Sequence, residues 1–348
     1  MGFFVTAAIR SAGLAAGLTF AGMLAAAPAQ ADGNLTVYCS VQEEWCQLMV
    51  NEFQKASGIS VAMTRKSSGE TYAQIKAEAA NPKGDIWWGG TGDPHLQAAE
   101  EDLTLAYESP MLSQLNDWAV AQHKTAGGKT VGIYMGALGF GYSADVLKEK
   151  GVEGPKCWAD LLKPEYKGEV QVANPNSSGT AYTFLATMVQ ILGEDEAFAY
   201  MKKLNENINQ YTKSGAAPAQ AASRGETLIG ISFQHDLVTP AVTSGVPMVV
   251  VSPCEGTGFE TGSMSIIKGA PNLDNARKWY DWALTPEAQA LGAQANSFQV
   301  PSNKSSPIPE AAPKLSEIKL IDYNFAKYGS SDERKRLLSR WDKEIAAQ

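Results

Sequence analysis

Three short apolar segments near the start of the chain alternate with two segments of helical periodicity. The apolar segments cover residues 35–39, 59–63 and 85–88, and apolar side chains at helical spacing run over residues 43–56 and 67–80 between them. Repeated strand–helix–strand units of this kind place their strands parallel, because each helix returns the chain to the edge where the strand began. The sequence therefore predicts an α/β fold with a mostly parallel sheet flanked by helices.

A second run of the same alternation begins near residue 169. Strands are expected at residues 169–172, 208–211, 228–232 and 247–251, and helices at residues 180–192, 194–205 and 217–224. Further helices are expected at residues 275–283, 286–293 and 331–347. The pattern thus repeats, but without a convincing internal sequence repeat.

No long flexible linker joins the two runs. The apolar stretch TVGIYMGALG at 130–139 can carry the chain outward, and CEGTGFETGSMSII at 254–267 can carry it back. We therefore expect two lobes with a cleft between them. The predicted division is a first lobe at 32–135, a second lobe at 136–256, and a return to the first lobe with the C-terminal helices at 257–348.

The first 31 residues have the pattern of an export signal. Arg10 precedes an apolar stretch at 12–27, and the tripeptide AQA at 29–31 offers small residues at the two positions that a signal peptidase reads. We expect cleavage before Asp32 and delivery to the periplasm. A membrane anchor is the alternative, but the stretch is short for a span. The cut site has no Cys for attachment of a lipid.

Four cysteines follow this segment. An even number in an oxidising compartment favours disulfides, although three pairings are open and reduced, buried thiols are the alternative. We favour Cys39 with Cys46, because a strand end and the first turns of a helix could meet there. Cys157 and Cys254 are then left to pair. The CxxC spacing of metal and redox sites is absent.

The formal net charge of −8 argues against a nucleic-acid partner. It does not argue against an anionic small ligand, because helix N-termini and single polar side chains can neutralise one locally. The chain that follows the predicted signal is long enough for about two domains with a sizeable core. We expect a monomer without a cofactor.

Hydroxyl-rich turns follow several of the predicted strands. They hold Ser40; then Ser67, Ser68, Gly69 and Thr71; then Thr91; then Asn176, Ser177, Ser178, Gly179 and Thr180; and Ser214. Each turn alone is most simply a helix cap. However, the carboxyl ends of parallel strands share one edge of a sheet, where ligands of such folds bind. Several such turns at one edge favour a shared site for an oxyanion, held by backbone N–H groups and hydroxyls.

Four stretches also carry a family resemblance. They are VYCS at 37–40, DIWWGG at 85–90, GFGYSADVL at 139–147 and SPCEGTGFETGSMSIIKGAPNLDNARKWYDWALTPEAQ at 252–289, of which the last is the most specific. Together they resemble type II periplasmic solute-binding proteins, in the branch that includes the ferric-iron-binding proteins. The resemblance implies two lobes that close over a small ligand by a hinge motion, and an inner-membrane ABC permease as partner.

One position separates this chain from the iron-binding members. They typically carry adjacent tyrosines after the strand that corresponds to residues 228–232, but here residues 233–236 read FQHD and no Tyr-Tyr pair occurs anywhere in the chain. His235 and Asp236 instead resemble the hexose-phosphate-binding members, in which such residues contact sugar hydroxyls. The resemblance leaves aminoalkylphosphonate, ferric iron and, more distantly, polyamine binding as alternatives.

Two carboxylates complete the predicted site. Glu255 and Glu260 flank the GTGF segment of the return crossing, and a carboxylate can accept paired hydrogen bonds from neighbouring sugar hydroxyls. For each of them, a hinge-fixing or surface role is the alternative. We expect the ligand to be a phosphorylated small molecule, most like a sugar phosphate such as a hexose phosphate, and we expect no metal site.

A hydrolase is the alternative from another class, because Ser, His and Asp are all present. The GxSxG elbow is missing from the chain. His235 and Asp236 are adjacent and should point in different directions, which makes a poor triad. We therefore expect a binding protein without catalytic residues.

Overall fold

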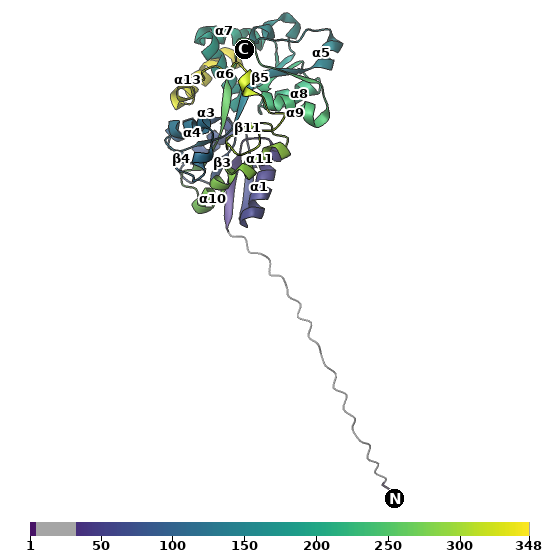
Figure 1. Ribbon diagram of the computed structural model, residues 1–348, viewed down its shortest axis with the longest axis vertical. Coiled ribbons are helices and arrows are strands. Elements are labelled where there is room, and N and C mark those ends of the chain that lie inside the picture. The colour runs from purple at the N-terminus through teal and green to yellow at the C-terminus, as the bar shows by residue number, and fades with distance from the viewer. Residues whose placement is uncertain (5–32, 348) are drawn as a thin grey trace. The chain divides into compact units, whose positions relative to one another are not determined.

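The computed structural model describes residues 1–4 and 33–347 (Figure 1). The predicted cleavage site and nearly all of the predicted signal peptide lie outside these residues. From residue 33 onward the described chain alternates strands and helices, and its strands join into one 11-stranded sheet. None of the described helices combines the length and the apolar composition that crossing a membrane requires.

The first part of the fold is a parallel sheet with helical connections. Its elements are β1 (Asn34–Cys39), α1 (Glu43–Ser57), β2 (Ser60–Arg65), α2 (Ser68–Ala77), β3 (Ile86–Trp88), α3 (Gly92–Glu100), β4 (Thr104–Leu105), η1 (Leu112–Gln114) and α4 (Asp117–Thr125). Strand β1 lies between β2 and β3 and is parallel to both, as the alternation predicted.

The second part repeats this arrangement. Its elements are α5 (Ala144–Lys150), η2 (Trp158–Leu162), η3 (Pro164–Tyr166), β6 (Val170–Ala173), α6 (Gly179–Leu192), α7 (Glu194–Asn205), β7 (Ile208–Thr212), α8 (Ala217–Ser223), β8 (Ile229–Phe233), α9 (Gln234–Ser244) and β9 (Met248–Val251). Strand β6 lies between β7 and β8 and is parallel to both.

Two antiparallel strands connect these parts. Strand β5 (Val131–Ser143) pairs with β10 (Phe259–Ile267) over its first half and with β8 and β9 over its second half. Strand β10 also pairs with β3 in the first part. Strand β5 overlaps the predicted outward crossing at 130–139, and β10 lies within the predicted return at 254–267. The exact lobe boundaries stay a prediction.

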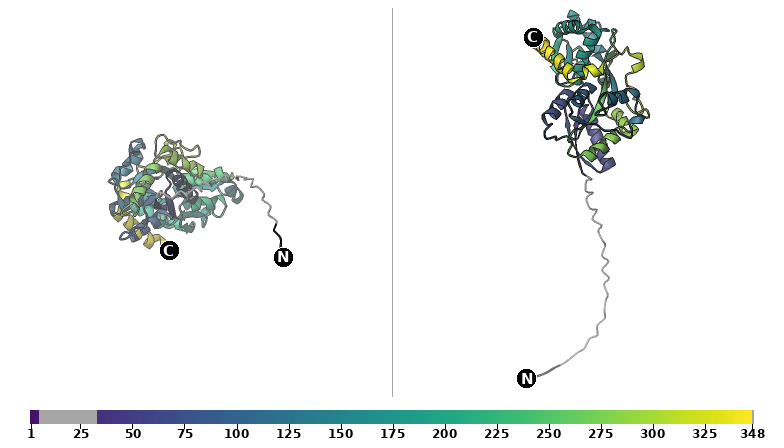
Figure 2. Two further views of the ribbon diagram at one scale, coloured as in Figure 1. Left: turned by 90° about the horizontal axis from the view of Figure 1, so that it is seen from below. Right: turned by 90° about the vertical axis from the view of Figure 1, so that its left-hand side faces the viewer.

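The chain ends in a helical segment that returns across the fold. It contains α10 (Leu273–Ala283), α11 (Pro286–Gln294), β11 (Val300–Pro301), η4 (Leu315–Glu317), α12 (Phe325–Tyr328), α13 (Ser331–Trp341) and η5 (Asp342–Ala346). The yellow C-terminal helices lie in the upper part of the molecule in Figure 1 and in the right-hand view of Figure 2, where α6 and α7 also lie. Their side chains Tyr328, Leu337 and Trp341 are buried in the same apolar cluster as Phe198.

Two large apolar clusters form the core. One contains Trp88 and Trp279 and packs α1 and α10 on the first part of the sheet. The other contains Phe140 and Trp158 and packs α6 and α7 on the second part. Both predicted disulfides are confirmed: Cys39–Cys46 ties the end of β1 to α1, and Cys157–Cys254 closes a loop of 97 residues.

Five of the described α-helices were not predicted: the short α5 and α12, and α3, α4 and α9. In α3 every residue from Gly92 to Ala99 is buried, so the helix lacks the polar stripe that reveals an amphipathic helix. In α9 the sequence holds Pro240 and several β-branched residues, which disfavour a helix locally. The short α4 has only weak amphipathic character. Tertiary packing, rather than local propensity, fixes these three elements.

Candidate ligand-binding site

Four helices begin at the lining of one cavity. The residue before α2 is Ser67, before α3 Thr91, before α6 Ser178 and before α9 Phe233, and all four line the cavity. The volume of the cavity is about 430 Å³, including the part that is open to solvent. Helix N-termini carry partial positive charge and unpaired N–H groups, so their convergence favours an anion inside.

The turn before α6 acts as a cap and still has donors left. Ser178 Oγ accepts a hydrogen bond from Ala181 N at 3.4 Å, and Asn174 O accepts one from Ser178 N at 2.9 Å. Within the described chain, no acceptor lies against the N–H groups of Gly179 and Thr180, which both line the cavity. Capping and anion binding are therefore compatible here.

Arg65 brings a full positive charge to the cavity, and the sequence analysis missed it. Its Nε donates to Val41 O at 2.8 Å, and its Nη2 lies 3.5 Å from Ser214 Oγ, which is also in the lining. Arg65 is the last residue of β2, two residues beyond the predicted strand end. Extending that strand would have placed it at the ligand edge of the sheet.

Three buried titratable side chains line the same cavity. His235 Nε2 lies 3.8 Å from Asp236 Oδ2 and 3.7 Å from Glu260 Oε1. Burial raises the pKa of Glu260 well above its usual range, and the neighbouring Asp236 and Asp93 raise it further. Burial lowers the pKa of His235, although Asp236 opposes this. These shifts favour the protonated form of Glu260 and the neutral form of His235, which reduces the charge of the group.

Hydrogen bonds around the cavity join the two parts of the sheet. Gly69 N donates to Ser177 O at 2.9 Å, and Ser67 Oγ donates to Lys213 O at 3.1 Å. Gln42 Nε2 donates to Asp236 Oδ1, so α1 reaches the start of α9. The structure is thus in a closed form, with the two parts in contact around the cavity.

The lining includes most of the residues predicted from the sequence. These are Ser40, Ser67, Ser68, Thr91, Ser178, Gly179, Thr180, Ser214, His235, Asp236 and Glu260. Besides Arg65, the lining contains Gln42, Tyr134 and Gln299, which carried no recognisable sequence signal. Whether these residues bind the ligand stays a prediction.

Five predicted residues lie outside the lining. Gly69 and Ser177 instead form the bond between the two parts described above, and Thr71 Oγ1 lies 3.0 Å from Ser40 Oγ. Asn176 is exposed and donates to Asp342 Oδ1 at 2.7 Å. Gly69, Thr71 and Ser177 thus contact groups next to the cavity, whereas Asn176 takes part in a surface contact.

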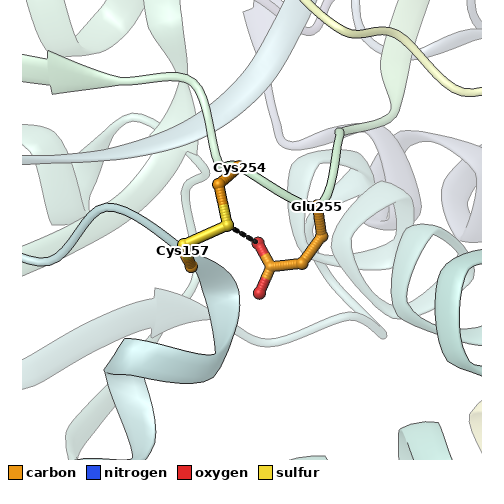
Figure 3. A group of neighbouring side chains, drawn as sticks. All are labelled: Cys157, Cys254 and Glu255. Carbon is orange, nitrogen blue, oxygen red and sulfur yellow. Dashed lines mark hydrogen bonds between the residues drawn. A yellow bond between two sulfur atoms is a disulfide. The ribbon is translucent and has the colours of Figure 1, made fainter.

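Glu255 is the fifth, and its place corrects the prediction (Figure 3). Its carboxylate accepts hydrogen bonds from Trp158 N at 2.8 Å and Ala159 N at 2.9 Å. It therefore fixes the start of η2 beside the Cys157–Cys254 disulfide, which is the alternative role weighed for it. The three side chains are close enough to hold a metal ion, but the disulfide removes both thiolates as ligands.

Residues 85–328 match the family of bacterial extracellular solute-binding proteins. The chain belongs to this family. An uncharacterized protein of Haemophilus influenzae is 43% identical over 343 residues, which cover 98% of this chain and 97% of the relative.

Two solved structures extend the comparison. The periplasmic binding protein AfuA from Actinobacillus pleuropneumoniae, with exogenous fructose-6-phosphate bound, is 45% identical and superposes with a TM-score of 0.88 over 91% of this chain and 100% of AfuA. The periplasmic binding protein P5PA is 41% identical, with a TM-score of 0.87 over 90% of this chain and 100% of P5PA.

These relatives confirm the predicted two-lobed periplasmic-binding-protein fold. The protein is a periplasmic solute-binding component of an ABC importer, whose partners are a small-molecule ligand and a permease. The relatives are binding proteins and not enzymes, which removes the hydrolase alternative.

Proposed function

We propose that this protein captures a phosphorylated small molecule, a sugar phosphate such as a hexose phosphate, by closing its two lobes over it. The observation that carries the proposal is the set of groups that line one cavity. It joins four helix N-termini and Arg65 with the buried group of His235, Asp236 and Glu260.

The first set of groups suits a phosphate. Thr91 N donates to Ser68 Oγ at 3.2 Å, and a Cβ atom added to Gly179 would come within 2.9 Å of Thr91 Cβ. The starts of α2, α3 and α6 therefore lie close together. Phosphate oxygens accept hydrogen bonds from hydroxyls, backbone N–H groups and guanidinium, all of which are present here.

The second set suits the hydroxyls of a sugar. Asp236 Oδ2 accepts a hydrogen bond from Ser232 Oγ at 3.2 Å, and its Oδ1 accepts one from Gln42. Burial favours the protonated form of Glu260, which can both donate and accept hydrogen bonds. A ring hydroxyl also donates and accepts, so it can pair with such groups without adding charge.

The similarity to AfuA supports the same ligand class, because 45% identity extends over nearly the whole described fold. The carboxyl groups of Asp236 and Glu260 also favour a second candidate, an aminoalkylphosphonate. Its ammonium group would meet these carboxyls while its phosphonate occupied the helix N-termini.

Mass spectrometry of whatever co-purifies with the protein, followed by calorimetry, tests the proposal. Glucose 6-phosphate or fructose 6-phosphate should bind and raise the melting temperature, since a ligand of the native state adds RT ln(1 + [L]/Kd) to its stability. Unphosphorylated glucose should bind far more weakly. Tighter binding of 2-aminoethylphosphonate would favour the second candidate, and a stoichiometric ferric complex with tyrosinate colour would refute both.

A variant of Arg65 tests the phosphate arm directly. Arg65→Met removes a charged hydrogen-bond donor, which should weaken hexose-phosphate binding by about 1.5–3 kcal/mol. Arg224→Met is the matched control, because Arg224 lies outside the cavity and pairs with Glu226 at 2.6 Å on the surface. Equal affinities of the two variants would remove Arg65 from the phosphate site.

A further inference from the structure

A buried arginine lies behind the cavity rather than in it. Arg334, on α13, is only 2% exposed, its Nε donates to Gln97 Oε1 at 2.8 Å, and its guanidinium lies 3.8 Å from the centre of the Tyr182 ring. Among the described residues, its Nη1 has no hydrogen-bond partner. A buried charge is costly unless an opposite charge offsets it, so we expect an anionic group near Arg334.

Asp93 is a buried carboxyl group whose charge interacts with Arg334, although no direct ion pair between the two is seen among the described residues. It is 1% exposed, and it lies four residues before Gln97 on the same face of α3, which is the face that Arg334 contacts. Tyr323 Oη donates to Asp93 Oδ2 at 3.2 Å, whereas Oδ1 has no partner within the described chain. Burial raises the pKa of Asp93 to about 6, and the Arg334 charge acts against that rise.

Asp93 matters to the cavity because of where it stands in α3. It is the second residue of the helix, and Thr91, just before the helix, lines the cavity. Its charge also reaches Glu260, whose pKa it helps to raise. A carboxylate at this place would repel an anionic ligand if nothing offset its charge.

We propose that Arg334 is a positioning residue for ligand binding, which offsets the charge of Asp93 from behind the cavity and holds the first turn of α3 ready for an anion. The inference rests on the proposed function, because it requires an anionic ligand. The titratable groups that interact with Asp93 are Arg334 on α13, Tyr323, Tyr182 on α6 and Glu260 on β10.

The test compares Arg334→Met with Arg336→Met in the full mature chain, with glucose 6-phosphate as probe. Arg336 is on the same helix, but its guanidinium pairs with Glu194 at 2.7 Å on the surface. The ratio of variant to wild-type Kd, measured by calorimetry at about pH 8 and about pH 5, cancels the titration of the ligand itself. Arg334→Met should raise the ratio about tenfold at the higher pH and less at the lower, where Asp93 becomes protonated. Arg336→Met should leave it near one.

The double variant Arg334→Met with Asp93→Asn separates charge from structure. It should regain most of the lost affinity and lose the pH dependence of the ratio, because the charge that Arg334 offsets is gone. An equal loss at both pH values, without rescue by Asp93→Asn, would make Arg334 merely structural and overturn the inference.

Asp93→Asn alone keeps the proposal testable if Arg334→Met does not fold. It should bind glucose 6-phosphate at least as tightly as the wild type at about pH 8, since it removes a negative charge near the anion. Tenfold weaker binding would contradict the proposal. If the wild type binds glucose 6-phosphate and the Kd of Arg334→Met equals that of the wild type, this inference alone is refuted. If the wild type binds no phosphorylated ligand, the proposed function is refuted as well.

Discussion

Gly179 is a point where the two lobes touch, and adding a single methyl group to it should impair closure. A Cβ atom at this position would overlap Thr91 Oγ1 and would lie 2.9 Å from Thr91 Cβ, which is closer than such atoms approach in proteins. Gly179 begins α6 and Thr91 precedes α3, so the clash lies between the lobes. Alanine favours the helix more than glycine does, and the fold of the open form should therefore persist in Gly179→Ala.

The size of the effect follows from the bonds near this contact. If the lobes stay apart, the hydrogen bonds Gly69 N–Ser177 O, Ser67 Oγ–Lys213 O and Arg65 Nη2–Ser214 Oγ are lost or stretched. At about 1 kcal/mol net for each, the closed form loses about 2–3 kcal/mol. The Kd of the ligand should therefore rise by roughly 30- to 150-fold.

Calorimetry with a hexose phosphate measures this change, and circular dichroism of the unliganded variant checks that the fold is intact. Thr91→Ala in the Gly179→Ala background removes the overlapping Oγ1 and should restore part of the affinity. Small-angle scattering should show a liganded Gly179→Ala protein that is less compact than the liganded wild type. Wild-type affinity and compactness in Gly179→Ala would show that the lobes do not need this contact to close.

Three further outcomes are expected. Asp236→Ala should weaken binding of a hexose phosphate by about 1.5–3 kcal/mol and binding of a simple phosphonate much less, and equal losses by calorimetry would place Asp236 away from the sugar. The pKa of Glu260 is higher in the folded protein than in the unfolded chain, so this group lowers the free energy of unfolding as the pH rises above the unfolded pKa. Denaturant unfolding should therefore show that the stability of Glu260→Gln increases relative to that of the wild type between about pH 5 and about pH 8. The pair Cys157→Ser and Cys254→Ser, which opens a loop of 97 residues, should lower unfolding stability by about 2–4 kcal/mol without changing Kd, and unaltered melting would contradict a structural role for this disulfide.

The sequence predicted the elements whose apolar pattern was regular. Helix α7 covers the residues expected of it, and α1 differs by one residue at its end. Both have apolar side chains on one face and polar ones on the other, and this regular spacing is what identifies a helix in a sequence. Helix α3 is buried on all sides and lacks this spacing, so the sequence did not predict a helix there.

The site was predictable where hydroxyl-bearing or glycine residues directly follow a strand. Turns at strand ends are local features, and Ser178, Gly179 and Thr180 could be found from a single stretch of chain. Arg65 and Glu255 show the limit of this reasoning. Arg65 reaches the cavity because β2 continues two residues further than its apolar pattern, and Glu255 leaves it because Trp158 and Ala159, nearly a hundred residues away in sequence, offer free N–H groups.

The acidic character of the cavity is consistent with an anionic ligand once each carboxyl is considered separately. Burial and the neighbouring acids Asp236 and Asp93 raise the pKa of Glu260 and favour its uncharged form. Asp93 lies behind the lining with Arg334 to offset its charge. Asp236 lines the cavity, and its carboxyl oxygens already accept hydrogen bonds from Gln42 and Ser232. The helix N-termini and Arg65 bring positive charge to the same lining, so a chain with a net charge of −8 can still present a site that suits phosphate.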